Sequence, residues 1–254
     1  MCRILLIINR IKNSTIINNF LKQSNTPKNT PLINCSRDYD INMDGYGFGW
    51  YKKNRWNIKN KFYYYKSKNN YFNDYNKYIV NTLNDKNIIL GHIRAITKDD
   101  KPNYYNSHPF LYNNTLWAHN GSINTKRIDA ESINIKSIDI KGTTDSEYMH
   151  KLFVKNLIKN NYNYEKNILI YTIKHFFKKL SNKDTANIVY MDQQYIWVSR
   201  YYKGTSTDPL SLYYDNSNGM IVSSEPVTET FHVFPENNVF VFNHNGDIVD
   251  TINI

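Results

Sequence analysis

The feature that most constrains the fold is an apolar run at the start of the chain. Ile4-Leu5-Leu6-Ile7-Ile8 follows Arg3 directly and is rich in β-branched residues. A short, uninterrupted apolar run of this kind predicts a buried strand. It is too short for the apolar region of a secretion signal, and it ends at Asn9-Arg10 without a cleavage-site pattern. We therefore expect a central β-strand over residues 3–8, with Cys2 held rigidly at its end.

Glycines and aromatic residues alternate in the segment Gly45-Tyr46-Gly47-Phe48-Gly49. Glycine at every second position of a strand lets another backbone or a ligand approach that face closely. A phosphate-binding loop would need a helix after these glycines, whereas aromatic, strand-like residues continue to Tyr65 after a turn at Lys53-Asn54. The segment therefore predicts a β-hairpin with one glycine-lined face.

The remaining elements follow from the spacing of apolar residues. Helical spacing is present over residues 14–22, where Ser14 is the expected N-cap, and over 72–83, 148–158 and 168–180. The polar residues 23–44 predict a long loop. Strands are expected over 88–94, 116–121, 188–191, 195–200, 212–214, 219–223 and 239–242. Helices grouped between two sets of strands predict an α+β fold with packed sheets, and no repeat or linker divides the single domain expected over 2–254.

Composition excludes several classes of protein. No run of about 18 apolar residues occurs, so we expect no membrane-spanning helix. The two cysteines, Cys2 and Cys35, give neither a disulfide framework nor metal-ligand spacing, which favours a reducing, cytoplasmic setting. The net charge of +10 raises the question of a nucleic-acid partner. Since the lysines are scattered and no nucleic-acid-binding motif accompanies them, we expect neither a specific nucleic-acid partner nor a membrane partner.

Cys2 has a chemical use that depends on its place in the chain. Once Met1 is removed, the thiol and a free α-amine with an ordinary pKa of about 8 belong to the same residue. The amine can then act as the base that activates the thiol as a nucleophile. A cysteine at position 2 also occurs in proteins that do not use it, so other residues must support this hypothesis.

Four later segments carry polar residues suited to catalysis or ligand binding: Gly91-His92-Ile93-Arg94, Asn106-Ser107-His108-Pro109, His119-Asn120-Gly121 and Thr144-Asp145-Ser146-Glu147. Each also has an ordinary structural interpretation. Arg94 could form a surface ion pair, Asn120-Gly121 is a common hairpin turn, and Asp145 could cap a helix. Taken singly, none of these segments predicts a function.

The histidines in these segments do not predict a metal site. His92, His108 and His119 are spaced unlike any metal motif, and no cysteine or acidic residue completes a ligand set near them. Packing or support of neighbouring residues is the simpler interpretation. We expect neither a metal nor another cofactor.

In this order, the segments resemble the class II glutamine amidotransferases, N-terminal-nucleophile hydrolases that release ammonia from glutamine. The similarity is greatest to the stand-alone branch that cleaves γ-glutamyl amides, and it covers nearly the whole chain. It is carried by Met1-Cys2-Arg3, Asp44–Tyr51, Arg94, Asn120-Gly121, Asp145 and Ser223–Pro226. The resemblance implies a four-layer αββα sandwich, the fold of N-terminal-nucleophile hydrolases.

The resemblance also implies three catalytic residues. Cys2 would attack the γ-carbonyl carbon and form a γ-glutamyl thioester, with its own α-amine moving the proton. The Asn120 side-chain amide and the Gly121 backbone N–H would form the oxyanion hole for the tetrahedral intermediate. Each of these groups belongs to a chemical type that suits the role.

Substrate binding is implied for four further residues. Arg94 would bind the α-carboxylate, since a guanidinium suits a bidentate partner, and Asp145 would bind the α-ammonium group. Thr97 and His108 lie where the family has residues that line the pocket. In the family, the arginine that corresponds to Arg94 is commonly followed by an aromatic residue or a second arginine, whereas this chain has Ala95-Ile96. The specificity for the leaving group therefore stays open.

Three functions remain open from the sequence. The first is hydrolysis of a γ-glutamyl amide, either glutamine or a γ-glutamyl peptide or amine. The second is the function of a glutaminase subunit that delivers ammonia to a separate synthase partner. A separate peptidase subunit is also a possible partner. The third is a catalytically idle scaffold that binds a ligand or a protein, and the presence of Cys2, Arg94, Asn120 and Asp145 argues against it.

Overall fold

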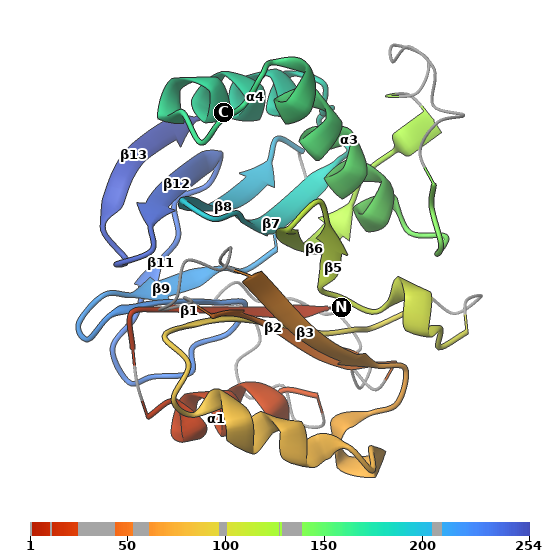
Figure 1. Cartoon of the computed structure of the whole chain (residues 1–254), viewed down its shortest axis with the longest axis vertical. Coiled ribbons are helices and arrows are strands. Elements are labelled where there is room, and N and C mark those ends of the chain that lie inside the picture. The colour runs from red at the N-terminus through yellow and green to blue at the C-terminus, as the bar shows by residue number, and fades with distance from the viewer. Residues whose placement is uncertain are drawn as a thin grey trace.

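The computed structural model describes residues 2–10, 12–24, 44–52, 61–96, 101–126, 128, 139–204 and 210–254. In these parts of the chain, two antiparallel β-sheets lie face to face and helices cover both outer faces (Figure 1). This arrangement is a four-layer αββα sandwich, so the predicted α+β fold is confirmed. The turn predicted at Lys53-Asn54, most of the loop predicted over 23–44, Cys35 and Thr97 lie outside the described residues.

The first sheet is built around the predicted N-terminal strand. Its seven strands follow the order β11 (His232–Val233), β9 (Tyr213–Asp215), β10 (Met220–Ser223), β1 (Arg3–Ile8), β4 (Ile88–Ile93), β2 (Tyr46–Lys52) and β3 (Lys61–Ser67). β1 is therefore the middle strand, and the predicted hairpin is confirmed as β2–β3. Because β1 pairs with a neighbour on each side, hydrogen bonds fix the strand end that carries Cys2.

The second sheet contains the later strands. Its order is β13 (Ile248–Asn253), β12 (Asn238–Asn243), β8 (Tyr195–Tyr202), β7 (Thr185–Met191), β6 (Thr115–Ser122) and β5 (Phe110–Tyr112). The sequence patterns did not predict β5, β11 and β13, each of which lies at an edge of its sheet. An edge strand needs little burial, and most residues of β11 and β13 are exposed or half-buried. Their apolar pattern is correspondingly weak.

Three α-helices cover the sheets in the described part of the chain. α1 (Ser14–Lys22) packs on the first sheet, and α3 (Asp145–Lys159) and α4 (Lys166–Lys178) pack on the second. These elements confirm the helices predicted over 14–22, 148–158 and 168–180. Ser14 is the wrong N-cap, because Asn13 occupies that position. Its side-chain amide donates to the carbonyl oxygens of Arg10 at 3.1 Å and Lys86 at 2.9 Å instead of capping the helix.

The helix predicted over 72–83 is wrong in type. Two short 3₁₀ helices, η1 (Tyr71–Asn73) and η2 (Lys77–Leu83), occupy this region. Asp74 lies between them in an extended conformation, with φ −86° and ψ 126°. Its carboxylate accepts hydrogen bonds from the hydroxyls of Tyr46 at 2.8 Å and Tyr65 at 2.5 Å. These contacts with the hairpin hold Asp74 out of a helical conformation.

The apolar run of β1 is buried from both sides. Ile4, Leu6 and Ile8 pack between the two sheets, whereas Leu5 and Ile7 pack in the layer that contains α1. Full burial of such a side chain stabilises the fold by roughly 1.5–3 kcal/mol. A strand with apolar layers on both faces needs an uninterrupted apolar sequence, which explains why the run does not alternate.

Glycines of β2 let the neighbouring layer approach this strand closely. A β-carbon on Gly47 would lie 2.1 Å from the carbonyl oxygen of His108, and one on Gly49 would lie 2.5 Å from Cδ1 of Leu116. Any larger residue would therefore displace these groups. The predicted glycine-lined face is covered by other parts of the protein, and its close contact places the segment around His108 against the first sheet.

Candidate active site

Cys2 lies at the end of β1, beside the segment that follows β4. Arg3 is opposite Ile93 in the β1–β4 pairing, so Cys2 lies next to Arg94 and Ala95. The Ala95 N–H donates to Sγ of Cys2 at 3.4 Å, and the thiol lies 3.6 Å from the Ala95 carbonyl oxygen, which can accept its proton. The contact between Cys2 and Ala95 is thus fixed by the backbone pairing of β1 and β4, two strands that are distant in sequence.

The surroundings of Cys2 act on its thiol in opposite directions. Burial raises the pKa of the Cys2 thiol, because it disfavours the thiolate. The hydrogen bond from Ala95 and the positive charges of the chain terminus, Arg94 and Arg3 lower this pKa. Burial is the larger effect, so the thiol needs a base close by to become a nucleophile at neutral pH.

Arg94 is held by the loop that precedes the glycine-rich hairpin. Its backbone N–H donates to the Gly45 carbonyl oxygen at 2.8 Å, and its carbonyl oxygen accepts from the Asp44 N–H at 3.2 Å. The Asp44 carboxylate accepts from the N–H of Ile96 at 2.8 Å. Arg94 is buried, so its interpretation as a surface ion-pair partner is wrong.

Asn120 and Gly121 lie within β6 and do not form a hairpin turn. They are paired with Asn187 and Ala186 of β7, and the strand continues to Ser122. Gly121 has φ +155°, and a β-carbon there would lie 2.0 Å from the Thr185 carbonyl oxygen. Only glycine fits this backbone, whereas the Asn120 side chain is buried.

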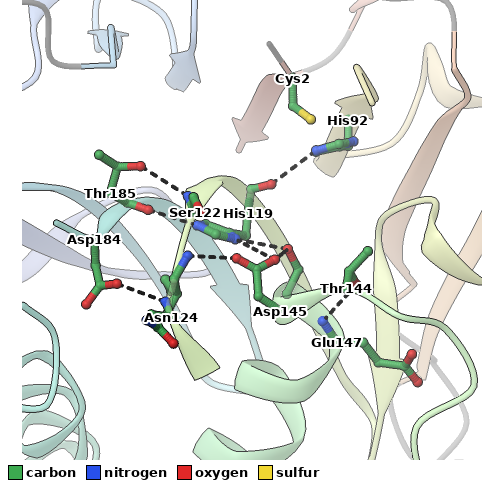
Figure 2. A network of polar contacts seen from close by, with 12 residues as sticks. Cys2, His92, His119, Ser122, Asn124, Thr144, Asp145, Glu147, Asp184 and Thr185 are labelled. Atoms are coloured by element: carbon green, nitrogen blue, oxygen red, sulfur yellow. Dashed lines mark hydrogen bonds and ion pairs between the residues drawn. The ribbon is translucent and has the colours of Figure 1, made fainter. Parts of the chain in front are cut away.

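A polar network joins the two sheets beside these residues (Figure 2). Nε2 of His92 in β4 lies 3.2 Å from the carbonyl oxygen of His119 in β6, the residue before Asn120. Nδ1 of His119 lies 2.9 Å from the hydroxyl of Ser146, and its Nε2 lies 3.1 Å from the Thr185 carbonyl oxygen. The network thereby connects the strand that leads to Arg94 with the strand that carries Asn120.

Asp145 completes this network at the start of α3. One carboxylate oxygen accepts from the Ile123 N–H at 2.8 Å, and the other accepts from the Ser146 hydroxyl at 3.2 Å and lies 4.0 Å from Nδ1 of His119. The carboxylate keeps 26% of its side-chain surface exposed, so a ligand can reach it. Thr144 is the N-cap of α3, and Asp145 as the cap is therefore wrong.

His108 lies in the interior next to His92. The two rings stack with their centroids 4.0 Å apart. Burial lowers the pKa of His92 to about 3 and holds the pKa of His108 well below its ordinary value. Both imidazoles are neutral near pH 7 and pack between the sheets. The pocket-lining role of His108 stays a prediction, as does that of Thr97.

The structure brings the other predicted residues together and shows that His119 and Ser146, which belong to the predicted segments, lie against Asp145. Cys2 and Arg94 meet through the β1–β4 pairing, and His92 links them to His119 and Asp145. His119 and Ser146 position the Asp145 carboxylate. The signal for them was their place directly beside Asn120 and Asp145, but proximity in sequence does not show which way a side chain points.

Comparison with known proteins identifies the family. The family model described as class-II glutamine amidotransferases matches residues 30–207. The chain belongs to this family. Membership supports hydrolysis of the glutamine amide as the general enzymatic activity. The match begins after Cys2 and therefore does not include this residue.

One curated relative is the probable glutamine amidotransferase DUG3 of Saccharomyces cerevisiae, which is 25% identical over 217 residues. The alignment covers 76% of this chain and 60% of the yeast protein. The chain thus spans less than two thirds of the length of this relative. The resemblance inferred from the sequence motifs is confirmed at the level of the family.

Solved structures show the same fold. Glutamine phosphoribosylpyrophosphate amidotransferase from B. subtilis matches with a TM-score of 0.66 and 14% identity, over 97% of this chain and 48% of that chain. A glutamine aminotransferase class-II domain protein from Silicibacter pomeroyi matches with a TM-score of 0.58 and 17% identity, over 97% and 96% of the two chains. At these identities the likeness concerns the fold alone, and it agrees with the two-sheet sandwich.

Two further findings concern the described residues only. No helix among them has the length and apolar character needed to cross a membrane. Within the same ranges, no three histidine, cysteine, aspartate or glutamate side chains gather so that they could hold a metal ion. The polar groups of the site are those of the Cys2, Arg94, Asn120 and Asp145 segments.

Proposed function

We propose that this protein hydrolyses γ-glutamyl amides through a thioester on Cys2. The observation that carries the proposal is the set of contacts that joins four segments far apart in the sequence. Cys2 contacts Ala95 next to Arg94, and the His92–His119 contact links them to Asn120 and Asp145. These segments supply a nucleophile, a cation, a hydrogen-bond donor and an anion, which together suit an amino-acid amide.

The proposed reaction begins with the α-amine of Cys2 after removal of Met1. The amine takes the thiol proton, and the sulfur attacks the γ-carbonyl carbon of the substrate. A C–S bond forms, the C–N bond breaks, and the leaving nitrogen takes the proton from the α-ammonium group. Water then gives up a proton to the same amine and attacks the thioester carbon. A C–O bond forms, the C–S bond breaks, the sulfur takes the proton back from the α-ammonium group, and the γ-carboxylate product leaves. Because burial raises the thiol pKa, a base within the same residue suits this site.

Asn120 and Gly121 are suited to stabilise the tetrahedral intermediates. In the proposal, the Asn120 amide and the Gly121 N–H donate to the oxyanion that forms from the γ-carbonyl oxygen. Pairing with β7 holds both residues, so the donors do not have to reorganise during the reaction. This rigidity supports their assignment, since preorganised donors stabilise a developing charge most strongly.

Arg94 and Asp145 are proposed to select the amino-acid end of the substrate. A guanidinium can bind the α-carboxylate with two hydrogen bonds, and the half-exposed carboxylate of Asp145 can bind the α-ammonium group. The Ile123 N–H and the Ser146 hydroxyl already orient the Asp145 carboxylate. Two opposite charges on rigid elements favour a free amino-acid end over an internal peptide unit.

The fate of the released nitrogen separates the first two hypotheses. If the isolated chain turns over glutamine or a γ-glutamyl peptide, it acts as an amidohydrolase. If it forms the thioester but does not turn over alone, a separate synthase or peptidase subunit is needed. An idle scaffold would neither turn over substrate nor react with an electrophilic substrate analogue at Cys2.

Intact-protein mass spectrometry tests the proposal. The mature chain should begin at Cys2, and a glutamine analogue with an electrophilic diazoketone should label it once. Cys2→Ala should abolish labelling and turnover. Cys35→Ala is the matched control, because Cys35 is the only other cysteine, and it should leave both unchanged. Full activity of a preparation that retains Met1 would contradict the mechanism.

A further inference from the structure

The segment that follows β10 lies beside the chain start and has no part in the proposed reaction. Ser223, Ser224 and Glu225 are all buried, and they come more than two hundred residues after Cys2 in the sequence. Burial of a carboxylate is costly unless a cation or hydrogen-bond donors compensate it. The position of Glu225 therefore needs an explanation.

Ser224 extends the pairing of β1 and β10 by one step. The last regular partners are Leu5 and Ser223. Beyond them, the Ser224 N–H donates to the Ile4 carbonyl oxygen at 3.0 Å, and the Ile4 N–H donates to the Ser224 hydroxyl at 2.9 Å. Both polar backbone groups of Ile4 are thus held by Ser224, two residues from the nucleophile.

Arg3 bridges Glu225 and the backbone of Cys2. Its Nη1 donates to the Cys2 carbonyl oxygen at 3.2 Å, and its Nη2 lies 3.4 Å from Oε1 of Glu225. The Arg3 and Glu225 side chains keep 6% and 4% of their surface exposed. The guanidinium is therefore held in place by a buried carboxylate while it holds the carbonyl group of the nucleophilic residue.

The backbone of Glu225 is itself fixed. Its carbonyl oxygen accepts from the Ser223 hydroxyl at 2.6 Å and from the Gln23 side-chain amide at 3.4 Å. These bonds tie the carboxylate to β10 and to the end of α1. Movement of Arg3 toward solvent would leave a buried negative charge without its cation, which is strongly destabilising.

We propose that Arg3 and Glu225 form a positioning pair that holds the Cys2 peptide so that its thiol stays on Ala95 and faces the substrate. This inference rests on the proposed function, because it concerns the nucleophile of that reaction. Neither residue touches the substrate. Their effect on the rate passes through the orientation of Cys2, and a displacement of about 1 Å at a reacting group can cost about 100-fold in rate.

The pair also predicts a pH dependence. Burial raises the pKa of Glu225 to about 7, while Arg3 and the hydroxyl of Ser211, in the segment before β9, act to lower it. Below this pH the carboxyl is neutral and the ion pair with Arg3 is lost. The contribution of the pair to the rate is therefore present above about pH 7 and lost as the pH falls.

Glu225→Gln tests the pair by removing the charge at nearly constant shape. We expect kcat to fall by about 10- to 100-fold with little change in KM. The contribution of Glu225 to the pH dependence of kcat near 7 should disappear, and only the dependence on the Cys2 α-amine should remain. Glu225→Asp, which keeps the charge, should restore part of the rate. Glu236→Gln is the control, since it removes the charge of a more exposed glutamate that lies 3.2 Å from another buried arginine, Arg200 of β8. It should leave kcat unchanged.

Alkylation of Cys2 by iodoacetamide reports on the pair without any substrate. In a Cys35→Ala background, Glu225→Gln should make Cys2 react faster, because the thiol is no longer held on Ala95, while turnover falls. If circular dichroism shows that Glu225→Gln is not folded, Arg3→Lys replaces it. Lysine keeps the positive charge but cannot bridge the Cys2 carbonyl oxygen and the Glu225 carboxylate. Unchanged alkylation, kcat and pH profile in a folded variant would overturn the inference. An inactive wild type with the expected change in alkylation would overturn the proposed function alone.

Discussion

Replacement of Gly121 by alanine gives a sharp test of the proposed oxyanion hole. Gly121 has φ +155°, a backbone conformation that residues other than glycine rarely adopt. A β-carbon there would lie 2.0 Å from the Thr185 carbonyl oxygen. The Gly121 peptide must therefore rotate, and its pairing with Ala186 must shift. Its N–H would no longer point toward the position proposed for the oxyanion.

The expected magnitudes follow from these two effects. Backbone strain of this kind costs about 1–3 kcal/mol in stability, and the clash with Thr185 adds to it. Since typical domains are stable by about 5–15 kcal/mol, the variant should remain folded. Loss of one oxyanion donor typically lowers kcat by about 100- to 1000-fold. KM for glutamine should also rise, but by less than kcat falls, because the β-carbon would lie 2.6 Å from Nε2 of His119, the ring that positions Asp145, whereas Arg94 is not displaced.

Urea unfolding and ammonia release from glutamine measure the two effects separately. Gly204→Ala is a suitable control, because the three heavy atoms nearest to its β-carbon would all belong to the side chain of Tyr202, and Gly204 has no left-handed backbone. It should leave kcat unchanged. A folded Gly121→Ala variant with the kcat of the wild type would refute the assignment of the Gly121 N–H to the oxyanion hole.

Two further outcomes are expected. Arg94→Lys should raise KM for glutamine by about 10- to 100-fold with a smaller effect on kcat, because it removes a bidentate charged contact. A substrate analogue without the α-carboxylate should give the same KM with the variant and the wild type. Equal KM values for glutamine would contradict the role of Arg94. Burial lowers the pKa of His92 and of His150 to about 3, so the folded state stays unprotonated while the unfolded state gains protons below about pH 6.5. Stability should therefore fall between pH 6.5 and 5 by about 1.6 kcal/mol for each histidine. Urea midpoints at the two pH values, compared with those of His150→Phe, measure the share of His150.

Much of the architecture follows from local patterns in the sequence. The run after Cys2 predicted β1, and the alternating glycines predicted the β2–β3 hairpin, because both patterns reflect burial on defined faces of a strand. The spacing of apolar residues predicted α1, α3 and α4, because it reflects burial of one face of each helix. The patterns were less informative where an element is held by partners outside it, as at Asp74, whose contacts with Tyr46 and Tyr65 replace a helix by two 3₁₀ turns.

The candidate site shows the same division more clearly. Asn120-Gly121 has the local chemistry of a hairpin turn, yet pairing with β7 keeps it extended within β6. Asp145 resembles a helix cap, but Thr144 takes that position and leaves the carboxylate half-exposed. The pairing with β7 is a tertiary contact, and so is the hydrogen bond from the Ile123 N–H that holds the Asp145 carboxylate, whereas the cap formed by Thr144 is local.

The sequence by itself determined which residues are chemically suited to the proposed reaction and that Cys2 directly precedes a buried central strand. It did so because residue type and the spacing of apolar side chains are local properties. Only the tertiary structure decided that Cys2 lies on Ala95, that His119 and Ser146 orient Asp145, and that Arg3 joins Cys2 to Glu225. These contacts join segments far apart in the chain, and they exist because sheet pairing and packing of the two sheets bring those segments together.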